Sequence, residues 1–319
     1  MGKSVVKHKI GVGSMGIVDK ENPESGYKTL KEAGVDCVDF NFDAYLNIND
    51  VMRGDINDFF DRPIDDIWED LKSHAEAAAK YGLTFEHMHA PFPMLIKNHD
   101  DWSEKMTRIT KNCMEICAKM GGKYIVVHPV SLAYECSKQE EHDFNIGLYK
   151  ELIPTARQCG VVICLENMFV EKNLHMMEGI CSDFKEATDM IDELNAMAGE
   201  ELFGFCFDVG HANLLGKNLY QSLVTLGKRV KILHIHDNDG LSDLHSLPYT
   251  FGRSWQGICT DWDGFLKGLA AIGYNGVINF ETYRAMFNFP KELHQQVLSL
   301  IVATGRYFSE QIGRCCRIS

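Results

Sequence analysis

The sequence predicts one α/β domain folded as a (β/α)8 TIM barrel. Its 319 residues are an ordinary length for a single barrel of this kind. Short apolar, β-branched runs alternate with segments of helical period, and no low-complexity linker divides them. Carboxylates and histidines directly follow several of the runs, as expected where the carboxyl ends of parallel strands converge. We therefore expect residues 1–319 to form one barrel with a C-terminal helix.

Eight apolar runs account for the strands of this barrel. Their apolar residues are mostly continuous, which is typical of parallel strands that are covered by helices. The predicted strands begin near His8, Cys37, Leu83, Tyr124, Val161, Phe203, Val230 and Gly276.

Apolar residues recur with helical spacing between the runs. Pro63 precedes one such segment and suits the first turn of a helix. Gly121 and Gly273 follow two others, and glycine commonly terminates a helix. The clearest predicted helices cover residues 64–78, 102–120 and 265–270, and the last outer helix starts near residue 293.

A glycine motif in the first loop offers a competing interpretation. Residues 11–16 match G-x-G-x-x-G after a strand, with Asp36 and Asp39 about where a ribose-binding acid belongs in a dinucleotide fold. Such a fold should begin a helix at that loop, but here no helical pattern starts before Pro23. Eight strand–helix units also exceed one nucleotide-binding sheet. We expect these glycines to form a tight first loop of the barrel.

The composition indicates which classes of function are disfavoured and which cellular compartment is expected. The 45 acidic and 32 basic residues give a net charge of −13, which disfavours a nucleic-acid surface. The eleven cysteines are scattered and none forms a CxxC pair, so reduced, structural thiols are expected. No signal core and no apolar run of roughly 18 residues occurs, which predicts a soluble, cytoplasmic protein without a membrane segment.

Four polar residues end separate strand-like runs. They are Glu166, Asp208, His236 and Glu281. Three carboxylates and an imidazole meeting at a barrel mouth would repel one another or shift their pKa values unless a divalent cation neutralised them. The four positions therefore predict a metal site.

Further histidines and an acid belong to the same region. His234 and His236 face the same way because side chains alternate along a strand. His89 and His128 end two earlier runs, and Asp243 and His245 follow the seventh. Each of the latter four either takes a direct part in the site or orients a neighbour. The histidines expected to be structural or solvated, on helices or remote loops, are His8, His74, His99, His142, His175 and His294.

Several motifs together resemble the xylose isomerase-like barrel superfamily, which holds sugar isomerases and epimerases as well as endonuclease IV-type repair enzymes. The matching segments are Leu165-Glu166-Asn167, Phe207-Asp208-Val209-Gly210-His211, His234-Ile235-His236-Asp237-Asn238-Asp239-Gly240, Asp261-Trp262 and Phe280-Glu281.

That resemblance implies a metal-dependent isomerase or epimerase. Glu166, Asp208, His236 and Glu281 would coordinate one divalent ion, with Mn expected first and Mg, Co or Zn as alternatives. Glu166 and Glu281 would exchange the proton beside the sugar carbonyl through an enediolate, and His211 would contact the substrate. The epimerases carry an arginine six residues after the seventh-strand histidine, where this chain has Ser242. Arg253 could substitute from the same loop. The expected catalytic residues are Glu166, Glu281, His211 and His128, and the expected substrate contacts are His89, His211, Arg253 and Trp255.

Two further activities share this ligand pattern. Nine residues match the zinc ligands of endonuclease IV, but the charge of −13 and the absence of basic loops oppose DNA binding. Catalytic subunits of bacterial C-glycoside deglycosidases also resemble this barrel, and there a lyase would expel an aromatic aglycone from a 3-oxo-sugar, with His128 or His89 as proton shuttle. The nine matching residues are His89, His128, Glu166, Asp208, His211, His236, Asp243, His245 and Glu281, and the residues expected to line an aglycone pocket are Phe92, Met94, Phe251 and Trp255.

The partners follow from these alternatives. The expected partner is a small-molecule sugar or glycoside, and a homo-oligomer is expected, with no nucleic acid and no membrane. The lyase alternative adds a small β-rich subunit. A non-catalytic sugar-binding barrel is the remaining possibility, but a binding module rarely keeps both acid/base glutamates.

Overall fold

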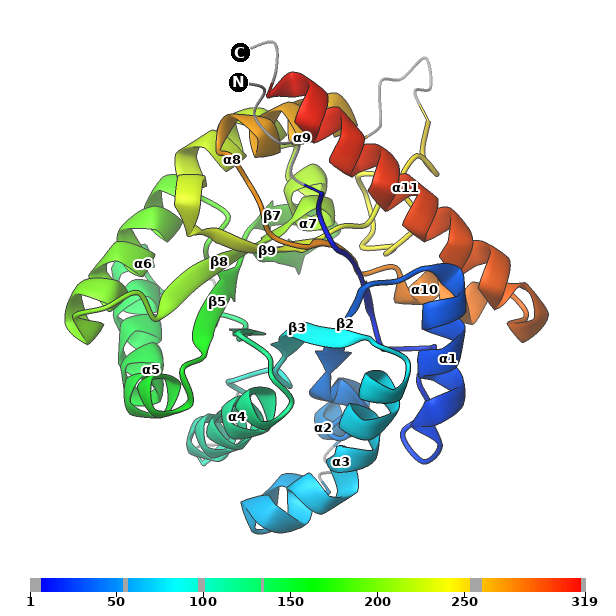
Figure 1. Cartoon of the computed structure of the whole chain (residues 1–319). Coiled ribbons are helices and arrows are strands. Elements are labelled where there is room, and N and C mark those ends of the chain that lie inside the picture. Colours follow the sequence, from blue (N-terminus) through cyan, green and yellow to red (C-terminus); the bar gives the residue numbers. More distant parts are fainter. Residues whose placement is uncertain (1–6, 54–56, 97–100, 133–134, 253–259, 317–319) are drawn as a thin grey trace.

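Eight parallel strands form the barrel at the centre of the structure, a computed structural model that describes residues 7–53, 57–96, 101–132, 135–252 and 260–316 (Figure 1). The strands pair in the order β10-β1-β2-β3-β4-β5-β8-β9. The barrel closes between β9 and β10, where Ile235 N donates to Asn279 O at 3.1 Å and Glu281 N donates to Ile235 O at 3.1 Å. The strands are β1 Ile10–Gly13, β2 Cys37–Asn41, β3 Thr84–His89, β4 Tyr124–Val126, β5 Val162–Glu166, β8 Phe203–Asp208, β9 Val230–His234 and β10 Ile278–Phe280.

These strands confirm the predicted fold class, and each begins within two residues of its predicted start. Helices surround the barrel, and the long α11 runs along its outside (Figure 1). The helices are α1 Pro23–Ala33, α2 Ile48–Met52, α3 Ile64–Lys80, α4 Trp102–Lys119, α5 Lys138–Cys159, α6 Phe184–Ala198, α7 Val209–Leu214, α8 Leu219–Leu226, α9 Trp262–Ala271, α10 Tyr283–Asn288 and α11 His294–Cys315, and short 3-10 turns cover Phe42–Ala44, Phe59–Asp61, Gly227–Arg229 and Lys291–Leu293.

Glycines end two of the predicted helices as expected. Gly121 lies just beyond α4 with φ 83°, and Gly273 lies just beyond α9 with φ 65°. Both are left-handed conformations that residues with a Cβ adopt at a cost. None of the helices in the described ranges is long and apolar enough to cross a membrane.

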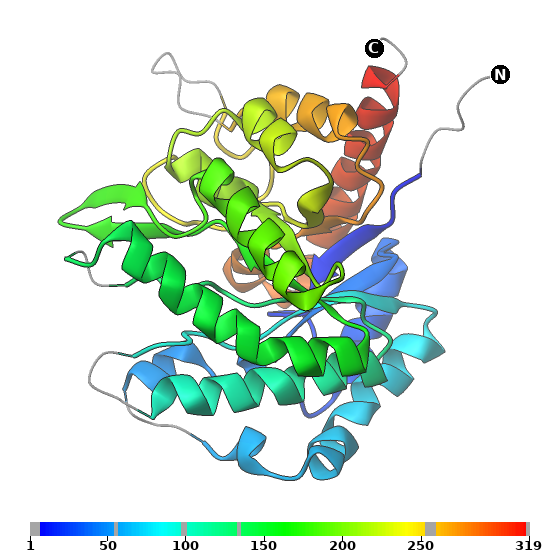
Figure 2. The ribbon, with the colours of Figure 1, turned by 90° about the vertical axis from the view of Figure 1, so that its left-hand side faces the viewer.

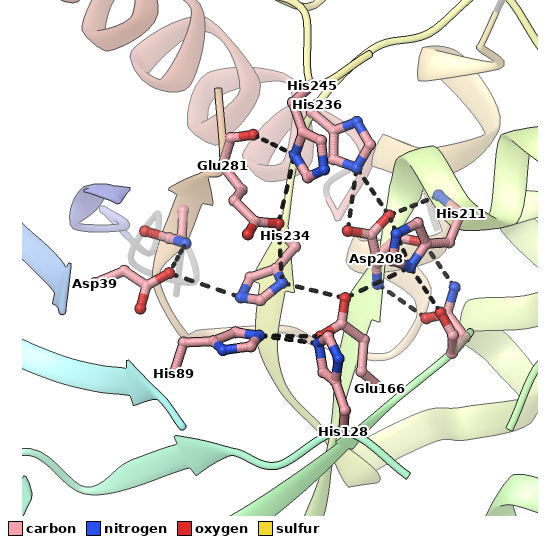
Figure 3. Close-up of polar contacts among 12 residues, drawn as sticks. Asp39, His89, His128, Glu166, Asp208, His211, His234, His236, His245 and Glu281 are labelled. Carbon is pink, nitrogen blue, oxygen red and sulfur yellow. Dashed lines mark hydrogen bonds and ion pairs between the residues drawn. The ribbon is translucent and has the colours of Figure 1, made fainter. Parts of the chain in front are cut away.

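The glycine motif forms the first barrel loop, as predicted. Gly16 has φ 76°, and α1 begins only at Pro23. Asp36 accepts a hydrogen bond from Ile10 N at 2.8 Å and pairs with Arg306 at 2.8 Å. Asp39 faces the barrel interior instead of an outer loop (Figure 3). The dinucleotide-fold alternative is therefore wrong.

The two faces of each strand meet different surroundings. Leu165, Phe205, Phe207 and Leu233 point outward into the core under the helices. The inward residues that alternate with them divide the interior into two parts. The apolar part contains Val126, Cys164, Cys206 and Ile232, and the polar part contains Asp39, His87, His234 and Asn279. Barrel interiors are usually filled by branched aliphatic residues, so the polar part is unusual.

A hairpin beyond β5 is absent from the sequence expectations. Strands β6 Phe169–Lys172 and β7 His175–Glu178 pair antiparallel and project from one side of the molecule (Figure 2). Asn173 and Leu174 make the turn with φ values of 52° and 64°. Glycine usually occupies such a turn, and its absence removed the signal for a hairpin. His175 is exposed, as expected, but lies on this strand and not on a helix or a loop.

Candidate metal centre

The four predicted ligands come together at the carboxyl ends of four strands (Figure 3). Glu166 ends β5, Asp208 ends β8, His236 lies two residues beyond β9, and Glu281 directly follows β10. The side chains of the first three are at most 2% exposed, and that of Glu281 is 16% exposed. The barrel thus brings three acids and an imidazole together at its mouth, with Glu281 the only partly exposed member of the four, as the strand ends predict.

Asp208 contacts both the segment that follows β9 and the first turn of α7. Its two oxygens both lie 3.1 Å from His236 Nε2, and Oδ1 also accepts from His211 N at 2.6 Å, which caps α7. Gly210 makes room for the imidazole, because a Cβ at that position would lie 1.8 Å from His236 Cε1. The glycine in this turn is therefore required by the close approach of a candidate ligand.

His234 connects the two glutamates. Its Nδ1 lies 3.3 Å from Glu166 Oε1 and 3.2 Å from Glu281 Oε2. Glu166 Oε2 faces His128 Nε2 at 3.2 Å. The ligand atoms consequently form overlapping groups and not one isolated set of four. The groups at the mouth whose ligand atoms lie within 4.8 Å of one another are His89–Glu166–His234, Asp208–His234–Glu281, Asp208–His211–His236 and His236–Asp243–His245.

The additional residues that the sequence singled out also face this cluster. His89 Nε2 lies 3.0 Å from His128 Nε2. His245 Nε2 lies 2.9 Å from Asp243 Oδ2, and His245 Nδ1 lies 2.9 Å from the carbonyl oxygen of Glu281. All four are placed so that they can either bind a ligand or orient the neighbouring residue.

His211 has one ring nitrogen fixed by the backbone. Its Nδ1 lies 2.9 Å from the carbonyl oxygen of Asn167, and its Nε2 lies 3.8 Å from Asp243 Oδ2. Burial lowers the pKa of His211, but Asp208 and then Asp243 outweigh burial and raise it to about 10. A proton on Nε2 would therefore be available for hydrogen bonding at the mouth.

The pKa values of Glu166 and Glu281 shift in opposite directions. Burial and the negative charges of Glu166 and Asp208 raise the pKa of Glu281 well above its ordinary value. Burial also acts on Glu166, but His234 and His128 outweigh it and lower the pKa of Glu166 well below its ordinary value. Burial lowers the pKa of His128 to about 4. Without another positive charge, the cluster does not support ionisation of both glutamates.

The residues present fit a divalent cation. Glu166 Oε2, His236 Nδ1 and Asp243 Oδ1 are buried and have no hydrogen-bond partner among the described residues. Unpartnered buried polar atoms are rare in proteins unless an ion or water satisfies them. Carboxylate oxygens suit Mn and Mg, and imidazole nitrogens suit Zn and Co.

Some predicted substrate contacts receive a different assignment. Met94 is only 2% exposed, and its sulfur accepts a hydrogen bond from Thr110 of α4 at 3.6 Å, so it packs in the core and does not line an aglycone pocket. Phe92 does lie at the mouth, with its ring centroid 4.5 Å from that of His128. Arg253 and Trp255 lie outside the described residues.

Three residues outside the predicted catalytic, substrate-contact and metal-ligand sets also shape the site. Asn167 exchanges two hydrogen bonds of 2.9 Å with the backbone of Asp208 and thereby joins the ends of β5 and β8. No pattern in the sequence signals this contact. His234 and Asp39 face inward and alternate with outward-facing residues of their strands, and this period of two is visible in the sequence.

Comparison with known families supports the fold. Residues 27–301 match the profile of the xylose isomerase-like TIM barrel family. The inosose isomerase of Bacillus velezensis is 28% identical over 233 residues, which cover 70% of this chain and 77% of that protein. Probable endonuclease 4 of Nitrosopumilus maritimus is 29% identical over 169 residues, which cover 48% of this chain and 55% of that protein.

Two other curated relatives are uncharacterised proteins. One from Sinorhizobium fredii is 27% identical and aligned over 58% of this chain, and one from Methanocaldococcus jannaschii is 30% identical and aligned over 61% of it. The alignments cover 55% and 63% of these two proteins, so the chain matches less than two thirds of their length.

Solved structures show the same fold. L-ribulose 3-epimerase superposes with a TM-score of 0.69 and 15% identity, covering 98% of this chain and 97% of that chain. The IOLI protein with a bound zinc atom superposes with a TM-score of 0.65 and 18% identity, covering 95% of this chain and 97% of that chain. At these identities the likeness concerns the fold.

Proposed function

Because the chain belongs to the xylose isomerase-like TIM barrel family, we propose that it is a divalent-metal-dependent sugar isomerase or epimerase. One observation carries the proposal: Glu166 and Glu281 come from opposite parts of the sequence and both approach His234 Nδ1, at 3.3 and 3.2 Å. Two carboxyl groups beside one buried cluster are what a proton transfer between two acid–base groups requires. The relative named inosose isomerase and the neighbour named L-ribulose 3-epimerase support this choice.

We assign the cation to Glu166, Asp208, His236 and Glu281, whose oxygen and nitrogen atoms surround the mouth. When bound there, the ion would polarise a sugar carbonyl and acidify the proton on the adjacent carbon. Its positive charge would also relieve the repulsion that raises the pKa of Glu281.

The glutamates would move the proton. One carboxylate removes the carbon-bound proton, and the other carboxyl group returns a proton to the substrate. Return to the opposite face of the same carbon inverts that carbon, and return to the neighbouring carbon moves the carbonyl. A carboxylate is a weak base, so alignment of the substrate must supply much of the rate.

Two histidines complete the proposed machinery. His211, fixed through Nδ1 to Asn167 O, would donate from Nε2 to a substrate oxygen. His128, at 3.2 Å from Glu166 and in contact with His89, would carry protons between Glu166 and the substrate hydroxyls. Carboxylates and imidazoles at the mouth suit hydroxyl and carbonyl groups better than a phosphate, which favours neutral sugars.

The lyase is the second candidate because of one contact. The ring of Phe92 lies 4.5 Å from that of His128, so an aromatic surface adjoins the His89–His128 pair. An aromatic aglycone leaving a 3-oxo-sugar would stack there and receive its proton from this histidine pair, in which burial lowers the pKa of His89 but Glu166 and Asp43 outweigh burial and raise it to about 9.

Hydrogen exchange separates the candidates. The protein, loaded with Mn²⁺, is incubated in deuterated water with a panel of ketoses, aldoses and 3-oxo-glycosides. Deuterium incorporation with inversion or carbonyl migration would support the isomerase, whereas release of an aglycone would support the lyase. Cleavage of abasic DNA in a parallel reaction, or no exchange in any sugar, would overturn the proposed function.

A further inference from the structure

A second cluster of metal-ligating side chains lies inside the barrel. It consists of Asp39 from β2, His87 from β3 and His234 from β9, which are 3%, 2% and 0% exposed. Asp39 Oδ2 lies 3.4 Å from His87 Nε2 and 3.6 Å from His234 Nε2. Three strands that are not all neighbours therefore direct these atoms to one point in the interior.

The atoms of this cluster do not satisfy one another. Among the described residues, Asp39 Oδ1, His87 Nε2 and His234 Nε2 have no hydrogen-bond partner. The two ring nitrogens approach Asp39 Oδ2 without making a hydrogen bond to it, and Asp39 Oδ2 accepts instead from Asn279 Nδ2 at 3.2 Å. Burying a carboxylate and two imidazoles without hydrogen-bond partners lowers the stability of the fold unless another group lies between them and satisfies their polar atoms.

The separations match those of atoms that share a metal ion. Two ligands that each lie about 2.1 Å from a tetrahedral ion are about 3.4 Å apart. The observed distances of 3.4 and 3.6 Å agree with this value and exceed a normal hydrogen bond. His234 Nδ1 also bonds Glu166 Oε1 at 3.3 Å, which leaves the lone pair of Nε2 directed toward Asp39. Metal-binding histidines usually have their other nitrogen bonded to a carboxylate in this manner.

We propose that Asp39, His87 and His234 bind a second divalent transition-metal ion inside the barrel, below the candidate metal centre at the mouth. Two imidazoles and one carboxylate suit Zn²⁺ or Co²⁺ better than Mg²⁺ or Ca²⁺. Asn279, whose amide is buried beside Asp39, is placed to complete the shell or to fix the carboxylate.

A cavity at the other end of the barrel adjoins this cluster at His87. His87 lines a cavity of about 600 Å³. The cavity is also lined by Lys9, which precedes β1, by Glu86 of β3 and by Lys231 of β9. An ion in this cavity would therefore lie next to His87, although His87 Nε2 itself is buried. Once bound, it would hold His234 with Nδ1 facing Glu166 and Glu281, so the inner ion would support the geometry of the mouth.

Anomalous diffraction tests the site in the unaltered protein. Crystals soaked in zinc chloride are measured above and below the zinc absorption edge. We expect a peak bounded by Asp39, His87 and His234. A peak at the mouth alone would overturn the inner site and leave the proposed function standing. An inner peak alone would support the inner site and count against metal dependence at the mouth, and no peak at either position would overturn both.

Metal stoichiometry gives a second test in solution. Protein stripped with a chelator and reloaded with Zn²⁺ should retain one zinc fewer per chain in His87→Gln than in the wild type. His74→Gln is the matched control, because His74 is equally buried but bonds Tyr27 and Tyr45 on the outer side of the barrel. It should retain the wild-type number. Equal zinc in His87→Gln and the wild type would overturn the proposal, and if that variant does not fold, the diffraction experiment decides.

Discussion

His236 Nε2 lies 3.1 Å from both carboxylate oxygens of Asp208, although 28 residues separate the two in the sequence. The contact joins the ends of β8 and β9, and it exists because Gly210 has no side chain between them. The absence of a side chain two residues from one candidate ligand therefore controls the position of another.

Gly210→Ala tests this dependence. The added Cβ would lie 1.8 Å from His236 Cε1, so the imidazole must move away from Asp208. We expect metal affinity to fall by about 10- to 100-fold, the size of effect seen when a residue that supports metal ligands is lost. Isothermal titration with Mn²⁺ measures it.

Gly147→Ala is the control for that substitution. Gly147 lies inside α5, and its added Cβ would meet no described atom within 4 Å. Alanine is the better helix former, so this variant should be more stable by about 0.5–1 kcal/mol with unchanged affinity. Equal Mn²⁺ affinity in both alanine variants would contradict the role assigned to Gly210.

Glu281→Gln should abolish turnover and preserve the fold. The amide keeps the shape of the side chain but cannot accept or return a proton in the proposed reaction. Activity above about a tenth of the wild type, a barrier change of only ~1.4 kcal/mol, would exclude Glu281 as an essential acid–base group. Circular dichroism checks the fold, and Glu171→Gln on the exposed face of β6 serves as the control.

The same variant changes the pH dependence of the metal-free protein. The pKa of Glu281 is raised by burial and by Glu166 and Asp208, so the folded state holds a proton that the unfolded chain releases. Stability from this group is fully present below about pH 4.5 and is lost as the pH rises toward the folded pKa. We expect the free energy of unfolding to decrease less with rising pH in Glu281→Gln than in the wild type. If denaturant unfolding gave the same pH dependence of stability for the wild type and Glu281→Gln, the raised pKa of Glu281 would be contradicted.

The strand pattern made much of this architecture predictable. Continuous apolar runs identified all eight barrel strands, and the barrel then required Glu166, Asp208, His236 and Glu281 to converge. The contacts between individual side chains inside the barrel, such as that of Asp39 with His87, were not predictable in the same way. It depends on irregular register, such as the shift between Val38 and Asp39 that sets Asp39 opposite His87. A slip of one residue turns a side chain to the other face of a strand, and nothing in the local sequence marks this one.

Local chemistry explains the other omissions. The β6–β7 hairpin turns at Asn173 and Leu174, both with positive φ, without the glycine that normally signals such a turn. Asn167 acts through its side-chain amide on the backbone of a neighbouring strand, a contact that only the folded barrel creates. Strand periodicity thus predicts which side chains face the interior, whereas hydrogen-bond partners depend on tertiary structure.

Metal removal should lower the stability of the protein. An ion bound to the folded state alone adds about 2.7 kcal/mol at a concentration 100 times its Kd. We expect the thermal midpoint to fall after chelation and to recover on addition of Mn²⁺, and Asp208→Asn to show a smaller recovery. A midpoint that is identical with and without the chelator and Mn²⁺ would oppose a structural contribution from the mouth ion.

His74 provides a pH prediction that does not involve either metal cluster. It is 2% exposed, its Nδ1 lies 3.0 Å from the Tyr27 hydroxyl, and its Nε2 lies 2.9 Å from the Tyr45 hydroxyl. Burial lowers the pKa of His74 to about 4, whereas the unfolded histidine titrates near its ordinary value of 6.5. Below that value the unfolded chain binds a proton that the folded state excludes, so stability falls as the pH decreases from 6.5 to 4.

The full effect of that difference is about 3 kcal/mol. Denaturant unfolding of the wild type and His74→Gln at several pH values isolates it, because the remaining groups titrate in both proteins. The variant should be less stable at pH 7, where it loses the bonds to Tyr27 and Tyr45, and this deficit should shrink toward pH 4. A deficit that stays constant across the range would show that His74 takes up a proton as readily in the folded protein as in the unfolded chain.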